Sequence, residues 1–148
     1  MNSASVSRSC ETRLLAGRIG EFIAANATLP WSPGKVDCCI VLADWLICQG
    51  QDDPASHLRG VYDDEAGFRR IIADAGDLVA VVQYCVRDIC RRVETPRGGD
   101  IGVLGSAGNI NRQFGALYDG HKWLVRTTRG FDPVCATPLA IWRLQCHS

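Results

Sequence analysis

The sequence predicts an α+β fold, in which N-terminal helices pack on a small antiparallel sheet. Segments with apolar residues at helical spacing fill the chain as far as Ile89, and short strand-like segments between Gly- and Asp-rich turns follow from Pro96. A group of helices followed along the chain by a group of strands is typical of α+β proteins. The chain has 148 residues, a length that suits one domain with a proper core. We expect a polar, flexible arm at residues 1–9 and a single domain at residues 10–148.

Four helices are expected, and three of them begin after a capping aspartate. The first runs from about Cys10 to Ala27. Asp63 or Asp64 caps the third helix, which ends before Gly76, and Asp77 caps the fourth. The inward-facing apolar residues recur at helical spacing. They are Leu15, Ile19, Phe22 and Ile23 in the first helix, Phe68, Ile71 and Ile72 in the third, and Leu78, Val82, Cys85, Val86 and Ile89 in the fourth.

The second helix is expected to be the centre of the fold. Asp37 is a good N-cap residue, Gly50 is a good C′ residue, and the segment between them is apolar nearly all round. A helix without a polar face is buried. Cys38 then lies in the first turn, where the helix dipole favours a thiolate, the nucleophilic form of cysteine. The alternative is a cysteine that only packs, and the adjacent charge of Asp37 opposes ionisation.

The strands are predicted by the turns that join them. A Gly-Asp turn opens a strand at Ile101–Leu104. Gln113–Tyr118 and His121–Thr127 form a hairpin around Asp119-Gly120, a dipeptide typical of hairpin turns. After the hairpin we expect an irregular stretch at Thr128–Thr137 and a last strand at Leu139–Leu144.

Composition argues against several classes of function. Sixteen basic residues balance sixteen acidic ones, so no strongly basic surface is expected for nucleic acid or an anionic membrane. The N-terminus lacks the apolar region of a signal peptide, and no run of about 18 apolar residues predicts a membrane span. We therefore expect a protein made in the cytosol without a signal peptide, with its eight cysteines reduced. No Cys or His spacing fits a zinc site, so we expect no metal and no cofactor.

A set of short motifs occurs in a distinctive order. A Trp-x-x-Gly-x-x-Asp-Cys turn precedes the central helix, a Gly-Asp turn opens the first strand, and an Asp-Gly hairpin follows. In this order the chain resembles the NlpC-type branch of the papain-like cysteine peptidases, and most closely the small NlpC-like proteins of phage and prophage tail gene clusters. The resemblance spans about residues 12–145. The matching segments are Trp31–Gly34 with Asp37-Cys38, Leu42–Trp45, Gly60–Asp63 with Glu65–Gly67, Arg97–Ile101, Phe114–Gly120 and Ala140–Arg143.

The resemblance implies a papain-like enzyme that cleaves amide bonds in bacterial cell-wall (peptidoglycan) peptides. It makes Cys38, beside Asp37, the nucleophile, and we assign substrate binding to Trp31 and Asp100 in the matching motifs. The implied base is a histidine that opens the strand after the Gly-Asp strand, and this sequence has Gln113 there. Glutamine takes up no proton near neutral pH. We expect Gln113 within a few ångströms of Cys38, and the three histidines lie elsewhere, at positions 57, 121 and 147.

Two hypotheses from different classes of function follow. The first is an active cysteine peptidase or amidase at a phage tail tip, which pairs Cys38 with an unorthodox partner such as a loop histidine. The second is a catalytically inactive domain of the same fold, which serves as a structural or assembly component and binds other tail or tail-tip proteins. In both, the resemblance implies a protein that is made in the bacterial cytoplasm without a signal peptide and is then assembled into a phage tail. A plain cytosolic binding domain without a phage connection is a weaker third alternative.

Overall fold

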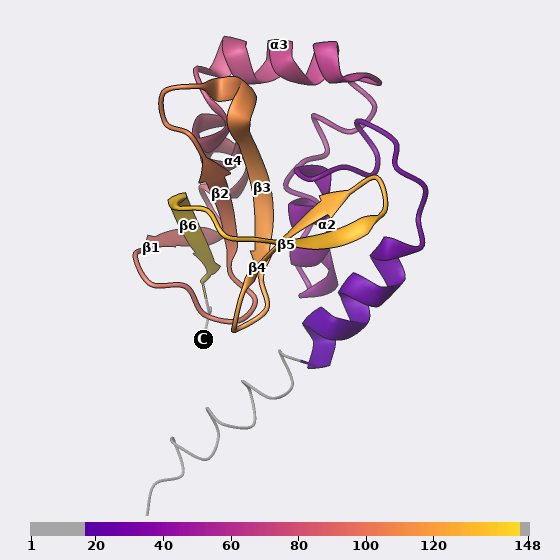
Figure 1. The fold of residues 1–148 in the computed structure, drawn as a ribbon, viewed down its shortest axis with the longest axis vertical. Helices are drawn as coiled ribbons and strands as arrows, with labels where there is room; N and C mark the ends of the chain where they lie inside the picture. The colour runs from indigo at the N-terminus through magenta and orange to yellow at the C-terminus, as the bar shows by residue number, and fades with distance from the viewer. Residues whose placement is uncertain (1–16, 146–148) are drawn as a thin grey trace, which may run out of the picture.

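The computed structural model describes residues 17–145, and Figure 1 shows their arrangement. The arm expected at residues 1–9, the start of the first helix and the terminal Cys146 and His147 lie outside the described residues. Within them, four α-helices precede a six-stranded antiparallel sheet, which confirms the predicted α+β class. No helix among residues 17–145 is long and apolar enough to cross a membrane.

The helices come first along the chain, and the strands follow. Residues 17–27 are helical, α2 is Ile40–Cys48, α3 is Glu65–Ala75 and α4 is Leu78–Val86. The strands are β1 (Cys90–Val93), β2 (Ile101–Gly105), β3 (Gln113–Tyr118), β4 (Trp123–Thr127), β5 (Gly130–Val134) and β6 (Pro138–Leu144), with a short 3-10 helix, η1 (Ile110–Arg112), before β3. Their order in the sheet is β1-β6-β2-β3-β4-β5, so β1 and β5 are the edge strands.

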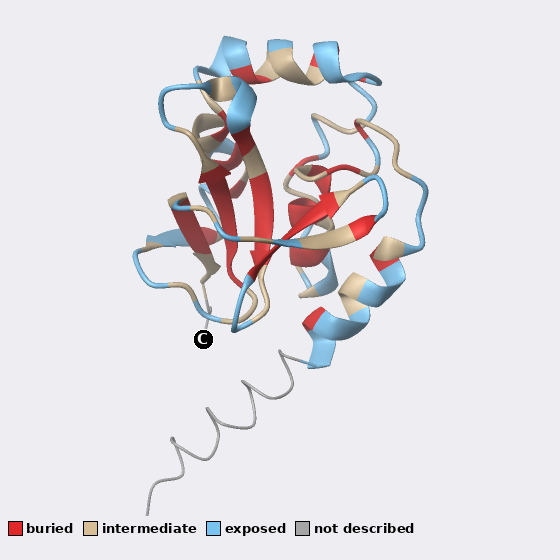
Figure 2. Ribbon diagram, in the orientation of Figure 1, coloured by how far each residue is buried: buried red, intermediate tan, exposed pale blue. Residues whose placement is uncertain are grey.

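The sheet separates two apolar layers, because alternate strand residues point to opposite faces. The main core joins the helices to one face, and its sheet residues include Ile101, Val103, Leu117 and Trp142. A smaller layer on the other face, which we call the outer cluster, has as its buried members Leu104, Ala116, Trp123, Val125 and Ile141. Figure 2 shows the buried residues concentrated on the central strands and α2, while α3 is largely exposed.

Helix α2 lies in the main core, as its apolar sequence predicts. Six of its nine residues are buried, and Ile47, at 40% exposed, and the exposed Cys48 depart from the prediction of an apolar helix buried all round. The Asp37 carboxylate accepts hydrogen bonds from the N–H groups of Cys39 and Ile40. The regular helix nevertheless begins only at Ile40, with Cys39 as its N-cap residue, so the prediction that Asp37 is the N-cap and Cys38 part of the first turn is wrong by two residues. Asp37 instead holds the turn that leads into the helix, and Cys38 lies in that turn.

The other predicted helix ends are confirmed. Gly50 adopts a φ of 99°, and the N–H groups of Gly50 and the next residue bond back into the last turn of α2, which is a Schellman motif. The Asp64 carboxylate accepts from the Gly67 N–H at the start of α3. The Asp77 carboxylate accepts from the Ala80 N–H at the start of α4. Local capping chemistry thus places all three helices.

The predicted hairpin forms, but its two strands stay paired only near their loop. The loop is 119–122, where the Asp119 carboxylate accepts from two backbone N–H groups. The pairs described for β3 and β4 are Leu117 with Leu124 and Tyr118 with Trp123. Beyond them β4 continues with β5, and Figure 1 shows this hairpin diverging from β3 and crossing over α2. The last strand, β6, confirms the prediction at residues 139–144.

The sequence analysis predicted neither of the two edge strands. The expectation of an irregular segment at 128–137 is wrong at β5, which pairs with β4 along its whole length. Pro133 in β5 lacks an N–H, and an edge strand tolerates that loss. The apolar residues of the fourth helix were predicted to continue as far as Ile89, whereas α4 ends at Val86 and β1 begins at Cys90. Two of the four residues of β1 are exposed arginines, so no apolar alternation marks it.

Candidate active site

A buried carboxylate organises the turn before α2. Asp37 is 5% exposed, and each of its oxygens accepts two hydrogen bonds. Oδ1 accepts from the N–H groups of Cys39 and Ile40, at 2.9 and 2.8 Å. Oδ2 accepts from the Gly34 N–H at 2.9 Å and from the Tyr62 hydroxyl at 2.6 Å. The carboxylate therefore fixes the turn that carries the candidate nucleophile, and its acceptor positions are filled.

Cys38 and Cys39 form an adjacent pair of thiols with unequal acidity. Their sulfur atoms are 3.9 Å apart. The hydrogen bond from the Cys39 thiol lowers the pKa of Cys38 below its ordinary value, against the opposing effect of burial. The Gly115 N–H lowers that pKa further, and the Asp37 charge raises it. The same thiol–thiol bond, together with burial, raises the pKa of Cys39 well above its ordinary value. The pair favours a thiolate at Cys38 and a thiol at Cys39.

Strand β3 approaches the backbone of Cys38 closely. A Cβ built on Gly115 would collide with the Cys38 carbonyl oxygen and would lie 3.0 Å from Cδ1 of Leu42, so only glycine fits here. The Cys38 side chain packs against the outer cluster, whereas that of Cys39 packs against the main core. The two side chains therefore pack against different layers, although their sulfur atoms are only 3.9 Å apart.

Gln113 stands at the start of β3, in the position of the implied base, and is 4% exposed. Its Oε1 accepts from the Leu78 N–H at the start of α4, at 3.0 Å. Its Nε2 donates to the Ser106 carbonyl, also at 3.0 Å. Cys38 is not among its hydrogen-bond partners. Gln113 joins α4 to the loop after β2, and it offers the thiolate no proton acceptor.

No histidine among residues 17–145 is hydrogen-bonded to Cys38. Among these residues, the imidazole that bonds a cysteine is that of His57, whose Nε2 lies 3.8 Å from the Cys85 sulfur. Burial raises the pKa of Cys85 to about 11, so the pair of Cys85 and His57 holds a thiol and not a ready nucleophile. His121 is exposed in the hairpin loop, and His147 lies outside the described residues. Within residues 17–145, no three His, Cys, Asp or Glu side chains are grouped to hold a metal ion.

The two residues assigned to substrate binding lie in different environments. Asp100 is 3% exposed and pairs with the Arg143 guanidinium at 2.7 Å. Its carboxylate also accepts from the Arg97 N–H at 2.8 Å, so it ties the turn before β2 to strand β6. Trp31 is half-buried in the loop before α2, and its ring forms no aromatic pair among the described residues. A binding role for either residue stays a prediction.

Sequence reasoning missed two partners of the site. Tyr62 donates to Asp37 from 25 residues further along the chain, and no local pattern predicts such a pair. Burial, aided by the Asp37 charge, raises the pKa of Tyr62 far above its ordinary value, so the hydroxyl keeps its proton. Cys39, treated as part of an apolar run, supplies the hydrogen bond that lowers the Cys38 pKa most. The one available signal was Gly115, since a glycine inside a strand indicates close backbone approach.

Fold and site together define an α+β domain with a carboxylate-held pair of cysteines at the start of its central helix. Residues 12–144 match the family described as Domain of unknown function (DUF6950), and the chain belongs to that family. No curated protein and no solved structure gives a significant match. The family match includes α2 and the entire sheet, so the candidate site lies within the family's domain.

Proposed function

We propose that this chain is an NlpC-like domain with a papain-like fold that serves as a structural or assembly component of a phage tail tip and does not hydrolyse amide bonds. The order of the sequence motifs supports the NlpC-like assignment. A cysteine at the start of a buried helix, packed against a glycine of an antiparallel strand, is consistent with it. The phage-tail setting rests on the resemblance of the motifs.

The observation that carries the proposal is that no imidazole within residues 17–145 is hydrogen-bonded to Cys38. Amide hydrolysis needs a group that gives a proton to the leaving amine, and histidine commonly fills that role. Here the partner of the Cys38 sulfur is a thiol, that of Cys39, whose pKa is raised. Gln113 uses both ends of its amide elsewhere. The pKa of Cys38 is therefore lowered without an imidazole partner, and no histidine among residues 17–145 is hydrogen-bonded to it to complete acyl transfer from an amide.

A cell-wall digestion assay tests the loss of hydrolysis. The wild-type chain and the Cys38→Ala variant are incubated with peptidoglycan stem peptides, and the products are identified by mass spectrometry. An active NlpC-type peptidase serves as the positive control. We expect wild type and variant to give the same background, because no imidazole among residues 17–145 is hydrogen-bonded to Cys38 to protonate the leaving amine. Cleavage by the wild type that disappears in the variant would overturn the proposal.

The assembly role is tested on complexes. The full chain is co-expressed with the products of neighbouring tail genes, and the masses of the complexes are measured by size-exclusion chromatography with light scattering. We expect a defined complex that also forms with Cys38→Ala, because assembly does not use the thiolate. A stable monomer that binds none of these proteins would remove the assembly role.

A cysteine peptidase or amidase that acts on cell-wall peptides is the second candidate function. The lowered pKa of Cys38 favours it, because the thiolate is the attacking species. General acid–base catalysis contributes about 10²–10⁴-fold to the rate, so turnover without it is expected to be slower by that factor. Slow cleavage that needs Cys38 would identify this candidate in the digestion assay.

A further inference from the structure

The assembly role leaves the pair of adjacent thiols before α2 without a use. The pKa of Cys38 is lowered, yet no hydrolysis is assigned to it. Its sulfur lies 3.9 Å from that of Cys39, and no other two cysteine sulfurs among residues 17–145 are in hydrogen-bond contact. Both residues are only partly buried. The pair therefore combines a reactive sulfur with a second sulfur beside it.

The two thiols differ in the way that reversible oxidation requires. A redox-sensitive site has a thiolate that attacks the oxidant and a neighbouring thiol that closes a disulfide. Cys38 suits the first role, because the Cys39 thiol and the Gly115 N–H both lower its pKa. Cys39 suits the second role, because its raised pKa keeps it a thiol until Cys38 has reacted. Each residue thus has one step of the oxidation to perform.

Free space beside Cys39 allows the second step. A disulfide is about 2.05 Å long, so the two sulfur atoms must approach each other by about 2 Å. A close-packed interior resists such a change of side-chain conformation. Cys39 lines an apolar cavity of about 40 Å³ between α2, α3 and α4. Its side chain is therefore not held by close packing on that side.

A disulfide between these two residues is expected to be easily reduced. The peptide bond that joins them is trans, and a trans peptide holds neighbouring Cα atoms about 3.8 Å apart. Ordinary disulfides join Cα atoms about 4.4–6.8 Å apart, and shorter spans are strained. Because a strained disulfide is reduced readily, the oxidised state is temporary and a thiol reductant restores the pair.

We propose that Cys38 and Cys39 form a reversible oxidation site for small peroxides, at which the pair passes from dithiol to disulfide. The Cys38 thiolate attacks one oxygen of hydrogen peroxide, and the O–O bond breaks to give a sulfenic acid and a hydroxide, which takes up a proton. The Cys39 sulfur then attacks the Cys38 sulfur, and the sulfenic hydroxyl leaves as water with the Cys39 proton. The two thiols lose two hydrogens, and the peroxide is reduced to two waters. Disulfide formation also protects Cys38 from sulfinic acid, which thiols do not reduce.

Peptide mapping of the full chain tests the proposal. The reduced chain is treated with hydrogen peroxide, and its remaining thiols are blocked with N-ethylmaleimide in urea. Trypsin cleaves after Lys35 and Arg59, so peptide 36–59 carries Cys38, Cys39 and Cys48. We expect this peptide to lose two hydrogens between Cys38 and Cys39 and to carry maleimide on Cys48. Dithiothreitol added before the blocking step is expected to restore labelling of all three cysteines.

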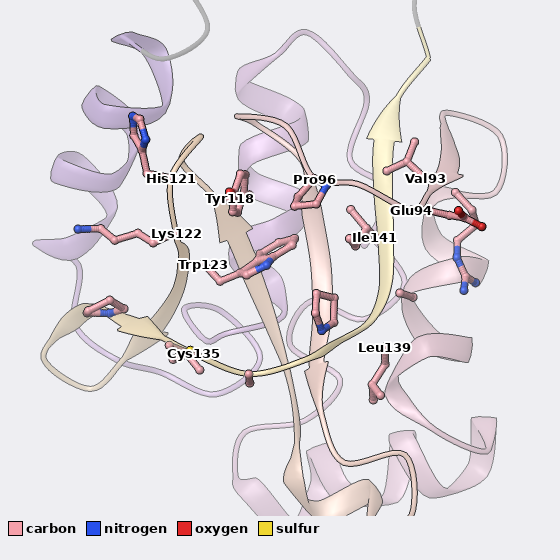
Figure 3. A pocket seen from close by; sticks show the side chains of 16 residues that line it. Val93, Glu94, Pro96, Tyr118, His121, Lys122, Trp123, Cys135, Leu139 and Ile141 are labelled. Carbon is pink, nitrogen blue, oxygen red and sulfur yellow. The ribbon is translucent and has the colours of Figure 1, made fainter.

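Cys135 is the control for an accessible thiol without a sulfur partner. Figure 3 shows it in the open groove on the outer face of the sheet, and no other cysteine lines this groove. Cys135 is exposed, so peroxide reaches it freely. We expect it to form no disulfide within the chain at a peroxide concentration that oxidises the pair.

Cys39→Ser separates the two steps. Serine keeps a hydroxyl that donates to the Cys38 thiolate, but it has no sulfur to close the disulfide. With dimedone, which traps sulfenic acids, we expect a Cys38 adduct in Cys39→Ser that the wild type lacks. Cys48→Ser, at the other end of α2, is the matched control and is expected to form the wild-type disulfide. The urea midpoint of each variant checks that it is folded.

Three results would overturn the proposal. They are oxygen added to Cys38 in the wild type in place of the loss of two hydrogens, a disulfide that joins Cys48 or Cys135, and full maleimide labelling of both Cys38 and Cys39 after peroxide. The map of the wild type decides the matter even if Cys39→Ser does not fold. The proposal does not rest on the assembly role, which is tested with Cys38→Ala, so either can fail while the other stands.

Discussion

Removal of the Asp37 carboxylate should destabilise the whole domain, because one buried side chain satisfies four donors. In Asp37→Ala, the N–H groups of Gly34, Cys39 and Ile40 and the hydroxyl of Tyr62 lose their acceptor. A buried donor left unsatisfied costs about 1–3 kcal/mol. Water enters the opened turn and satisfies some of them, so we expect a loss of about 4 kcal/mol and not the full sum. For a chain of this size that lowers the Tm by about 8–16 °C.

Two milder variants each remove part of this hydrogen bonding, so each measures a part of the lost free energy of unfolding. Tyr62→Phe removes one donor and leaves the other three bonds of the carboxylate, so we expect a loss of about 1–2 kcal/mol. Asp37→Asn keeps Oδ1 as an acceptor and loses the bond from the Gly34 N–H, while the Tyr62 hydroxyl turns to accept from the new amide. We expect Asp37→Asn to lower the free energy of unfolding by about 2 kcal/mol.

Urea unfolding followed by tryptophan fluorescence measures these losses as shifts of the midpoint at constant m. Asp88→Ala is the matched control, because the Asp88 side chain is 85% exposed and its ion pair with Arg87 is long, at 3.8 Å. We expect the control to stay within about 0.5 kcal/mol of the wild type. If Asp37→Ala loses less than about 1 kcal/mol, the carboxylate does not hold the turn as described here.

Three further predictions concern the surroundings of Cys38. Cys39→Ala removes the hydrogen bond that lowers the pKa of Cys38 most, so the pH midpoint of Cys38 alkylation should rise and its rate at neutral pH should fall; an unchanged midpoint would contradict the thiol–thiol bond. Gly115→Ala places a Cβ against the Cys38 carbonyl and should cost about 2 kcal/mol or more in urea unfolding, whereas Gly108→Ala, with open space around its Cβ, should cost little. Gln113→Ala leaves the N–H at the start of α4 without its acceptor and should cost about 1–3 kcal/mol without any loss of Cys38 alkylation, since Gln113 is not a base for it.

The features that follow from local chemistry were predictable. Asp64 and Asp77 each cap a helix in the structure, because an N-cap needs only its own next few residues. Asp37 bonds the N–H of Ile40, the first residue of α2, from the turn before the helix. The Asp119 loop of the hairpin follows from the same kind of local hydrogen bonding. The α+β class needed no more than the order of such segments along the chain.

The features that depend on distant residues were not predictable. Arg126, which looks like a surface residue in the sequence, is 1% exposed, and its guanidinium bonds to Asn26, one hundred residues away. Tyr62 meets Asp37 only because the chain folds back across the start of α2. The hydrogen bond between Gln113 and the Leu78 N–H was not predictable for the same reason. Leu78 lies on another element, and no residue near Gln113 in sequence indicates the contact.

The alkylation rate of Cys38 as a function of pH tests the central claim most directly, namely that this thiol ionises with the help of Cys39 and without an imidazole. The rate is measured for Cys38 alone by mass spectrometry, in the wild type and in His57→Ala and His121→Ala. The account predicts a single ionisation with a midpoint below the ordinary thiol value of about 8.5, unchanged in both histidine variants. A second ionisation near the ordinary histidine value of about 6.5, lost in one of those variants, would contradict it.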